Sequence, residues 1–251
     1  MREAQKTVSP WDSLDPRLRL LAAALGSVVL AILHTPQAAC AGLTLALLLT
    51  TGGASAGLGR RLVLLNGFIA FLWLLVPLTA GGEALARFGP LSVSRRGVEL
   101  AFLATLKANA VFLLFQALLG GMDAPVAGQA LEGLRVPAKL VFLILFTFHF
   151  LHVLADEWER LGTAARLRGF VPHTSLHTYR TLGYQLGMVL VRGLDRSRRV
   201  YEAMLLRGFA GHFRSAARFR ARGRDFVFAG LFVPALALVA LYDLFPEVCC
   251  G

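Results

Sequence analysis

Residues 62–80 read LVLLNGFIAFLWLLVPLTA, nineteen residues without one charged side chain. A helix needs about 20 mainly apolar residues to cross the ~30 Å hydrocarbon core of a bilayer. The length and composition of this run therefore predict a membrane-spanning helix.

The composition of the whole chain also indicates a membrane protein. Only 16% of the 251 residues are charged and 56% are apolar, whereas about 25% are charged in an ordinary soluble domain. Too few charges exist to cover a soluble surface, so lipid must surround much of the chain. We therefore expect an all-α, polytopic membrane protein with five to six hydrophobic helices. The other apolar runs cover 18–35, 37–51, 98–120, 137–155 and 226–245.

One segment carries most of the positive charge. Residues 156–225 hold fourteen arginines and six acidic residues, a net charge of +8 out of +11 for the chain. Arginine and lysine are retained on the cytosolic side of membrane proteins. Because no apolar run of about 17 residues occurs here, we expect two amphipathic helices, one ending near Gly169 and one over about 176–207. The predicted division is 1–155 for the N-terminal segment and transmembrane helices, 156–224 for cytosolic helices, and 225–251 for the last transmembrane helix and C-terminus.

The side of the N-terminus stays open at this point. Five full crossings before residue 156 would place it outside, whereas the positive-inside rule favours the cytosol for a basic N-terminus. Either one early run does not cross fully, or the N-terminal charge bias is weak. The N-terminal basic residues are Arg2, Lys6, Arg17 and Arg19. A further short amphipathic helix is expected between 122 and 136, lying at the interface.

A tetrapeptide repeats in the basic segment. Leu167-Arg168-Gly169-Phe170 recurs as Leu206-Arg207-Gly208-Phe209, each at the end of an expected helix. A glycine after the last turn can adopt the left-handed conformation that ends a helix, and an arginine there complements the helix dipole. Two interpretations follow: ordinary helix caps, or arginines that reach a carboxylate-bearing groove on a partner, a contact for which guanidinium is well suited.

Two more motifs complete an order that resembles a known family. Leu14-Asp15-Pro16-Arg17-Leu18-Arg19-Leu20 precedes the first apolar run, and Leu134-Arg135-Val136-Pro137 precedes the fifth. With the two Arg-Gly repeats, they resemble the transmembrane (T) component of energy-coupling-factor transporters, in the cobalt-type (CbiQ-like) branch. The resemblance covers residues 14–245. One departure is that leucine stands in both repeats where the family usually has alanine.

The resemblance implies a function. It implies a coupling subunit of an ATP-driven cobalt or nickel uptake transporter in the bacterial inner membrane, connected with cobalamin biosynthesis. Its partners would be two cytosolic ATPase subunits, one substrate-binding membrane protein and a small accessory membrane subunit. The ATPase-docking residues would be Arg168, Gly169, Arg207 and Gly208, and the family-motif positions are Asp15, Pro16 and Pro137. We expect no cofactor, no bound metal, no nucleic acid and no enzymatic activity.

Other residues leave alternatives. The chain has no P-loop sequence, so energy from ATP must come from a partner. His149, His152 and Asp156 form the one tight polar set, and a membrane enzyme built on it is the main alternative. A membrane-anchored binder of anionic lipid or nucleic acid through the basic segment is a weaker alternative, since few aromatics there could stack on bases. Lys107 and Asn109 either serve function or make hydrogen bonds between helices.

Overall fold

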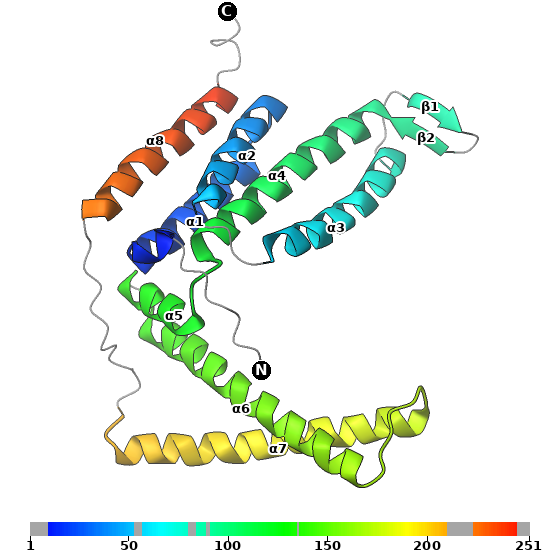
Figure 1. The fold of residues 1–251 in the computed structure, drawn as a ribbon, viewed down its shortest axis with the longest axis vertical. Helices are drawn as coiled ribbons and strands as arrows, with labels where there is room; N and C mark the ends of the chain where they lie inside the picture. Colours follow the sequence, from blue (N-terminus) through cyan, green and yellow to red (C-terminus); the bar gives the residue numbers. More distant parts are fainter. Residues whose placement is uncertain are drawn as a thin grey trace, which may run out of the picture. The chain divides into compact units, whose positions relative to one another are not determined.

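The computed structural model describes residues 10–52, 57–79, 84–88, 91–134, 136–209 and 223–244 (Figure 1). These residues form eight α-helices, one 3-10 helix and one short β-hairpin. The prediction of a helical membrane protein is confirmed, and the hairpin is an addition to it. The chain divides into two compact units, one of residues 1–123 with 219–251 and the other of residues 124–218.

The elements of the first unit come from both ends of the chain. Its helices are η1 (Pro10–Ser13), α1 (Pro16–Ile32), α2 (Pro36–Thr51), α3 (Leu58–Thr79), α4 (Arg95–Leu119) and α8 (Gly223–Leu244). The antiparallel strands β1 (Ala84–Phe88) and β2 (Leu91–Ser94) join α3 to α4. The second unit consists of α5 (Ala124–Gly133), α6 (Ala138–Leu167) and α7 (Leu176–Leu206).

The apolar runs of the sequence correspond to α1, α2, α3, α4, α6 and α8. Four of these, α3, α4, α6 and α8, are long and apolar enough to cross a membrane, while α2 is a shorter apolar helix of 16 residues. The sequence marks the short turn between α1 and α2, because Thr35 caps α2 and Pro36 occupies its first position.

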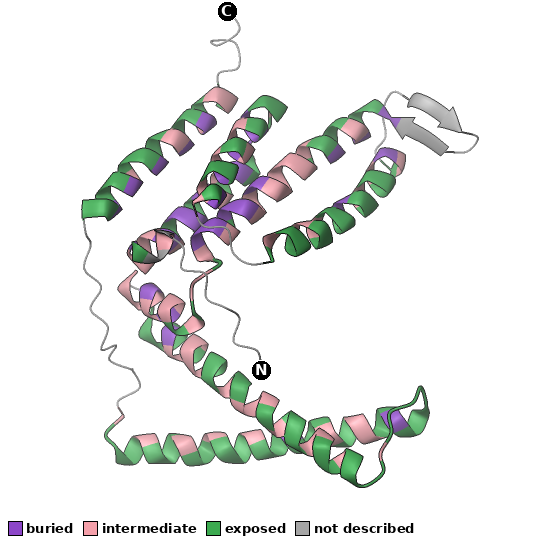
Figure 2. Ribbon diagram, viewed as in Figure 1, coloured by how far each residue is buried: buried purple, intermediate pink, exposed green. Residues whose placement is uncertain are grey.

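The core of the first unit lies where α4 packs against α1 and α2, and where α8 packs against the same two helices. The largest fully buried side chains are Leu30, Leu114 and Leu118. A Cβ on Gly26 would lie 2.6 Å from the Cδ2 atom of Leu114, so a larger residue in α1 would force the buried side chain of Leu114 in α4 to move. Buried residues lie on the facing sides of these helices, and their other faces are exposed (Figure 2).

Polar side chains bridge the helices at membrane depth. Asn66 of α3 and Asn109 of α4 exchange side-chain hydrogen bonds of 3.1 and 3.2 Å. The Nζ atom of Lys107 donates to the carbonyl oxygen of Ala31 in α1, at 2.9 Å. The interpretation of Lys107 and Asn109 as interhelical hydrogen-bonding residues is therefore confirmed.

Two hydrogen bonds fix one end of the first unit. The backbone amide of Asp15 donates to Oδ1 of Asp225 at 2.9 Å, so the first turns of α1 and α8 lie together. The buried guanidinium of Arg19 donates through Nε to the carbonyl oxygen of Leu118, at 2.7 Å. The start of α1, the start of α8 and the end of α4 therefore share one end of the unit.

The opposite end is fixed by a single carboxylate. Asp243, in the last turn of α8, accepts hydrogen bonds from the amides of His34 and Thr35 and from the Thr35 hydroxyl, at 2.7 to 2.9 Å. The side chain thus holds the turn between α1 and α2. It follows that α1 and α8 run in the same direction through the unit.

The long helix of the second unit differs from what its sequence predicts. The fifth apolar run and the first amphipathic helix were expected as separate elements, but α6 continues through both over 30 residues. No proline occurs between Ala138 and Leu167, so nothing in the sequence interrupts the helix. The expected boundary at 155/156 therefore falls inside α6. The short helix expected near 122–136 is confirmed as α5, and the helix expected near 176–207 as α7.

The two long helices of this unit cross each other. A Cβ on Gly193 of α7 would lie 2.7 Å from Cδ2 of Leu154, so the helices touch at this point. Arg192 and Glu157 form an ion pair beside it. Packing and charge together hold α6 and α7 at one crossing.

Candidate functional site: the tips of α6 and α7

The first Arg-Gly motif closes α6. Arg168 is the C-cap, and Gly169 follows with φ +81°, in the left-handed region that favours glycine. The amide of Gly169 donates to the carbonyl oxygen of Arg166, and that of Phe170 to the carbonyl oxygen of Ala165, both at 3.0 Å. This pair of bonds is a Schellman cap, which satisfies carbonyls that the helix leaves free.

The second motif closes α7 in the same way. Arg207 is the C-cap and Gly208 has φ +79°. The amide of Gly208 donates to the carbonyl oxygen of Leu205, and that of Phe209 to the carbonyl oxygen of Met204, both at 3.0 Å. The capping interpretation is therefore confirmed for both copies, and the two tips share one backbone geometry.

The tips present a leucine and an arginine to solvent. Leu167 is 84% exposed and Leu206 is 90% exposed, while both arginines and both glycines are exposed. Within the part of the chain that the structure describes, no hydrogen bond or ion pair engages the guanidinium of Arg168 or Arg207. The leucines that replace the family's alanines therefore point outward and do not disturb helix packing.

The two tips lie far apart. Arg168 ends α6 just before α7 begins, and Arg207 ends α7, so the length of α7 separates them (Figure 1). For its 31 residues this length is about 46 Å. The unit thus offers two matching surfaces at well-separated points.

A hollow accompanies the first tip. It has a volume of about 460 Å³ and lies between the end of α6 and the first turns of α7, beside Arg168. His177, Tyr184 and Gln185 give it polar walls, and Leu161 and Phe170 give it apolar ones. Neither His177 nor Tyr184 was among the site residues predicted from the sequence. His177 and Tyr184 are seven residues apart, which places them on one face of a helix. This spacing could have indicated from the sequence that both side chains line one site.

The other family-motif positions start helices. Asp15 is the N-cap of α1, its side chain accepts from the amide of Arg17 at 3.0 Å, and Pro16 occupies the first helical position. Pro137 is the N-cap residue of α6. Arg135, in the same motif as Pro137, lies outside the described residues. These positions build the scaffold and lie away from the exposed tips in sequence.

The polar set proposed for the enzyme alternative lies on the surface of α6. His149, His152 and Asp156 are exposed on α6, and His152 Nδ1 lies 2.9 Å from the carbonyl oxygen of Phe148. Among the described residues, no group of three His, Cys, Asp or Glu side chains could hold a metal ion. No feature of the described residues favours a catalytic role for this set.

The fold and these tips define a class: a multi-pass cell-membrane protein that carries a pair of long, crossed helices with matching exposed ends. Comparison with known families gives the particular assignment. The CbiQ family, described as "Cobalt transport protein", matches residues 7–217, and the chain belongs to this family. The family is one of transport proteins.

A curated relative supports the same assignment. The cobalt transport protein CbiQ of Rhodobacter capsulatus is 30% identical over 149 residues. The match covers 58% of this chain, and the chain spans 60% of the length of that relative.

Proposed function

We propose that this chain is the transmembrane coupling subunit of an ATP-driven cobalt or nickel uptake transporter. It would transmit the motion of two cytosolic ATPases to a substrate-binding membrane protein, and would itself have no catalytic site. The observation that carries this proposal is the pair of equivalent caps, with exposed Arg168 and Arg207 at the two ends of α7.

Two equivalent tips suit two equivalent partners. Each tip combines an exposed leucine, able to enter an apolar groove, with an arginine free to form a bidentate contact with a carboxylate. Because the chain lacks a P-loop sequence, ATP hydrolysis is assigned to these partners. The hollow beside Arg168 gives the first tip room for a side chain of the docked subunit.

The topology of the chain supports a cytosolic location for Arg168 and Arg207 at the ends of α6 and α7. The end of α4 and the start of α8 lie at the same end of the first unit. The segment that connects them therefore leaves this unit and returns to it on one side of the membrane. It must cross the membrane an even number of times, and α7 is not a candidate span. We therefore infer that α6 does not cross, although it is long and apolar enough, and that the arginine-rich segment stays in the cytosol.

This topology also removes the conflict over the N-terminus. The start of α1 and the end of α4 share one end of the first unit, so the chain crosses the membrane an even number of times between them and the start of α1 also lies in the cytosol. Asp15 and Asp225 then lie on the cytosolic side together, as their hydrogen bond requires. The basic N-terminal residues agree with this side.

The apolar part of α6 supports contact with a membrane protein. Leu140, Leu143, Phe148 and Leu151 are between 43 and 59% exposed. So many exposed apolar side chains on one helix need a cover of lipid or protein. We assign this cover to the substrate-binding membrane protein, with a small accessory membrane subunit beside it.

The crossing of α6 and α7 supplies a means to transmit motion. The close contact of Gly193 with Leu154 and the ion pair of Arg192 with Glu157 join the helices near their middles. Displacement of one tip therefore moves both helices together. Motion of the ATPases would reach the apolar face of α6 by this route.

Co-purification tests the docking role. The tagged full chain would be expressed with candidate ATPase subunits, comparing wild type with Arg168→Glu, Arg207→Glu and the double variant. We expect each single reversal to lower ATPase recovery at least ~10-fold, the loss of one charge-assisted contact, and the double variant to recover none. The matched control is Arg198→Glu, which reverses an exposed arginine in the middle of α7.

The outcomes separate clearly. Loss of ATPase in the double variant but not in Arg198→Glu, with unchanged elution from a sizing column, supports the coupling subunit. Full ATPase recovery by the double variant would reduce the two motifs to helix caps. A wild type that recovers no ATPase would overturn the coupling function itself.

A further inference from the structure

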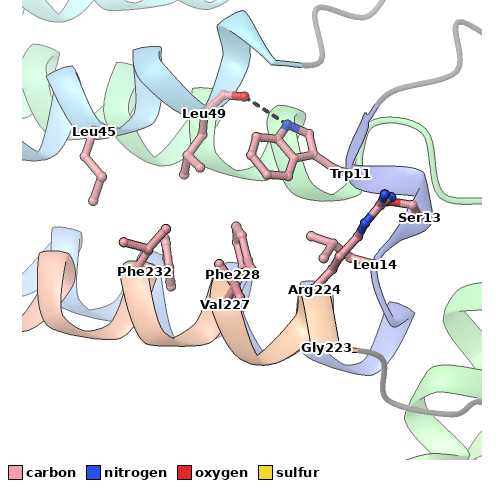
Figure 3. A pocket seen from close by; sticks show the side chains of 11 residues that line it. Trp11, Ser13, Leu14, Leu45, Leu49, Gly223, Arg224, Val227, Phe228 and Phe232 are labelled. Carbon is pink, nitrogen blue, oxygen red and sulfur yellow. Dashed lines mark hydrogen bonds between the residues drawn. The ribbon is translucent and has the colours of Figure 1, made fainter.

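A cleft in the first unit stands apart from the tips of α6 and α7. It has a volume of about 610 Å³, in the range of small-molecule binding sites. Figure 3 shows Leu45 and Leu49 projecting from α2 and Phe228 and Phe232 from α8 toward the same space. The coupling function makes no use of it.

One end of the cleft is polar. Arg224, in the first turn of α8, reaches across this end beside η1 (Figure 3). Trp11 lies next to it, with its indole nitrogen donating to the carbonyl oxygen of Leu49 at 3.0 Å and its ring 5.5 Å from that of Phe228. An exposed guanidinium and an anchored tryptophan at the end of an apolar groove are typical of the membrane–water interface.

We propose that this cleft binds an anionic phospholipid of the cytosolic leaflet, with one acyl chain between α2 and α8 and the phosphate on Arg224. The inference is independent of the proposed coupling function.

The dimensions fit an acyl chain. From Arg224 to Phe232 the cleft follows eight residues of α8, about 12 Å. One leaflet of the hydrocarbon core is about 15 Å deep. Val227 and Leu231 on its rim are 63 and 71% exposed, so the groove is open along its length to the surrounding lipid.

The charge fits an anionic headgroup. Arg224 is the last arginine of the basic segment, so the positive-inside rule places this end of the cleft in the cytosolic leaflet. Its guanidinium makes no hydrogen bond or ion pair with any described residue. Anionic lipids are attracted to basic side chains at this surface, and guanidinium pairs well with phosphate.

Fluorescence of Trp11 gives a readout at the site. The full chain would carry Trp73→Phe and Trp158→Phe, which leaves Trp11 as the one tryptophan. Lipids with brominated acyl chains quench a tryptophan that they touch. The probes are brominated phosphatidylglycerol and brominated phosphatidylcholine, each titrated against unlabelled lipid, with inorganic phosphate as a competitor.

We expect phosphatidylglycerol to bind at Trp11 about ten-fold more tightly than phosphatidylcholine, as for one charge-assisted hydrogen bond. Arg224→Gln should remove this preference and Arg224→Lys should keep most of it. The matched control is Arg60→Gln, an exposed arginine in the first turn of α3. Leu45→Phe, which fills the cleft, should lower quenching by both lipids.

Three results would overturn the site. Equal quenching by the two lipids in the wild type would show a groove without headgroup selection. Displacement of phosphatidylglycerol by inorganic phosphate would show an anion site and no lipid site. Absence of quenching in the wild type and in Arg224→Lys would show that another part of the chain covers Trp11.

Discussion

The backbone amide of Asp15 donates a 2.9 Å hydrogen bond to Oδ1 of Asp225, which joins residues 210 positions apart in the sequence. The contact brings together the first turns of α1 and α8. It gives the Asp-Pro-Arg motif a structural role that its position before the first apolar run does not reveal.

Removing this acceptor should destabilise the first unit. Asp225 is 6% exposed, and Asp225→Ala leaves the part-buried amide of Asp15 without this partner, a loss of about 1–3 kcal/mol. Asp225→Asn keeps a side-chain oxygen and should lose less. The measurement is reversible unfolding in detergent, with Asp195→Ala on the exposed face of α7 as the control. Equal free energies of unfolding for Asp225→Ala and Asp195→Ala would contradict a stabilising role for the hydrogen bond between Asp15 and Asp225.

The opposite end offers an independent test. Asp243 accepts hydrogen bonds from three donor groups, the His34 amide and the Thr35 amide and hydroxyl, so Asp243→Ala should cost about 1–3 kcal/mol or more. Thr35→Val removes only the hydroxyl donor and the cap of α2, and should cost about 1 kcal/mol. Unfolding in the same detergent measures both. A larger loss from Thr35→Val than from Asp243→Ala would show that Asp243 does not organise the turn.

The asparagine pair between α3 and α4 can be tested by a double-mutant cycle. Asn66→Leu, Asn109→Leu and the double variant should give a coupling free energy near 0.6 kcal/mol and below about 1.7 kcal/mol, the range for hydrogen bonds inside membranes. Additive single effects would indicate that each asparagine acts alone.

The cap glycines should be sensitive to a methyl group. Gly169→Ala and Gly208→Ala place an L side chain at φ near +80°, at a cost of about 1–2 kcal/mol each. Gly162→Ala is the control, because this residue lies inside α6 with open space around its Cβ position, and alanine there should stabilise the helix. Hydrogen exchange of the amides in the last turn measures local opening. If hydrogen exchange in the last turn were unchanged in both Gly169→Ala and Gly208→Ala, the positive φ at these positions would not strain an alanine.

The inferred topology predicts which residues face the same side. In a chain without native cysteines, Met122→Cys, Gly169→Cys and Gly223→Cys should react with a membrane-impermeant maleimide from the cytosolic side. Arg96→Cys, at the start of α4, should react from the other side. Opposite labelling of Met122→Cys and Gly169→Cys would show that α6 crosses the membrane after all.

The sequence by itself determined the class of protein. Long runs of mainly apolar residues determined the hydrophobic helices, because only lipid can cover them. Local chemistry fixed both caps: Gly169 and Gly208 end helices because glycine alone adopts φ near +80° without strain. The order of these motifs also indicated the CbiQ family, whose match covers residues 7–217.

Only the tertiary structure decided what depends on contacts distant in sequence. It joined Asp15 to Asp225, and this contact sets the shared end on which the proposed topology of α6 rests. It also joined the fifth apolar run to the amphipathic helix after it, whereas a charge-based boundary separated them. The cleft lined by Trp11 and Arg224 has no sequence signature, since its walls come from three elements and from residues up to 221 positions apart, Trp11 and Phe232. The spacing of apolar residues in the sequence shows which face of a helix is apolar. Which other helix packs against that face is determined only by the tertiary structure.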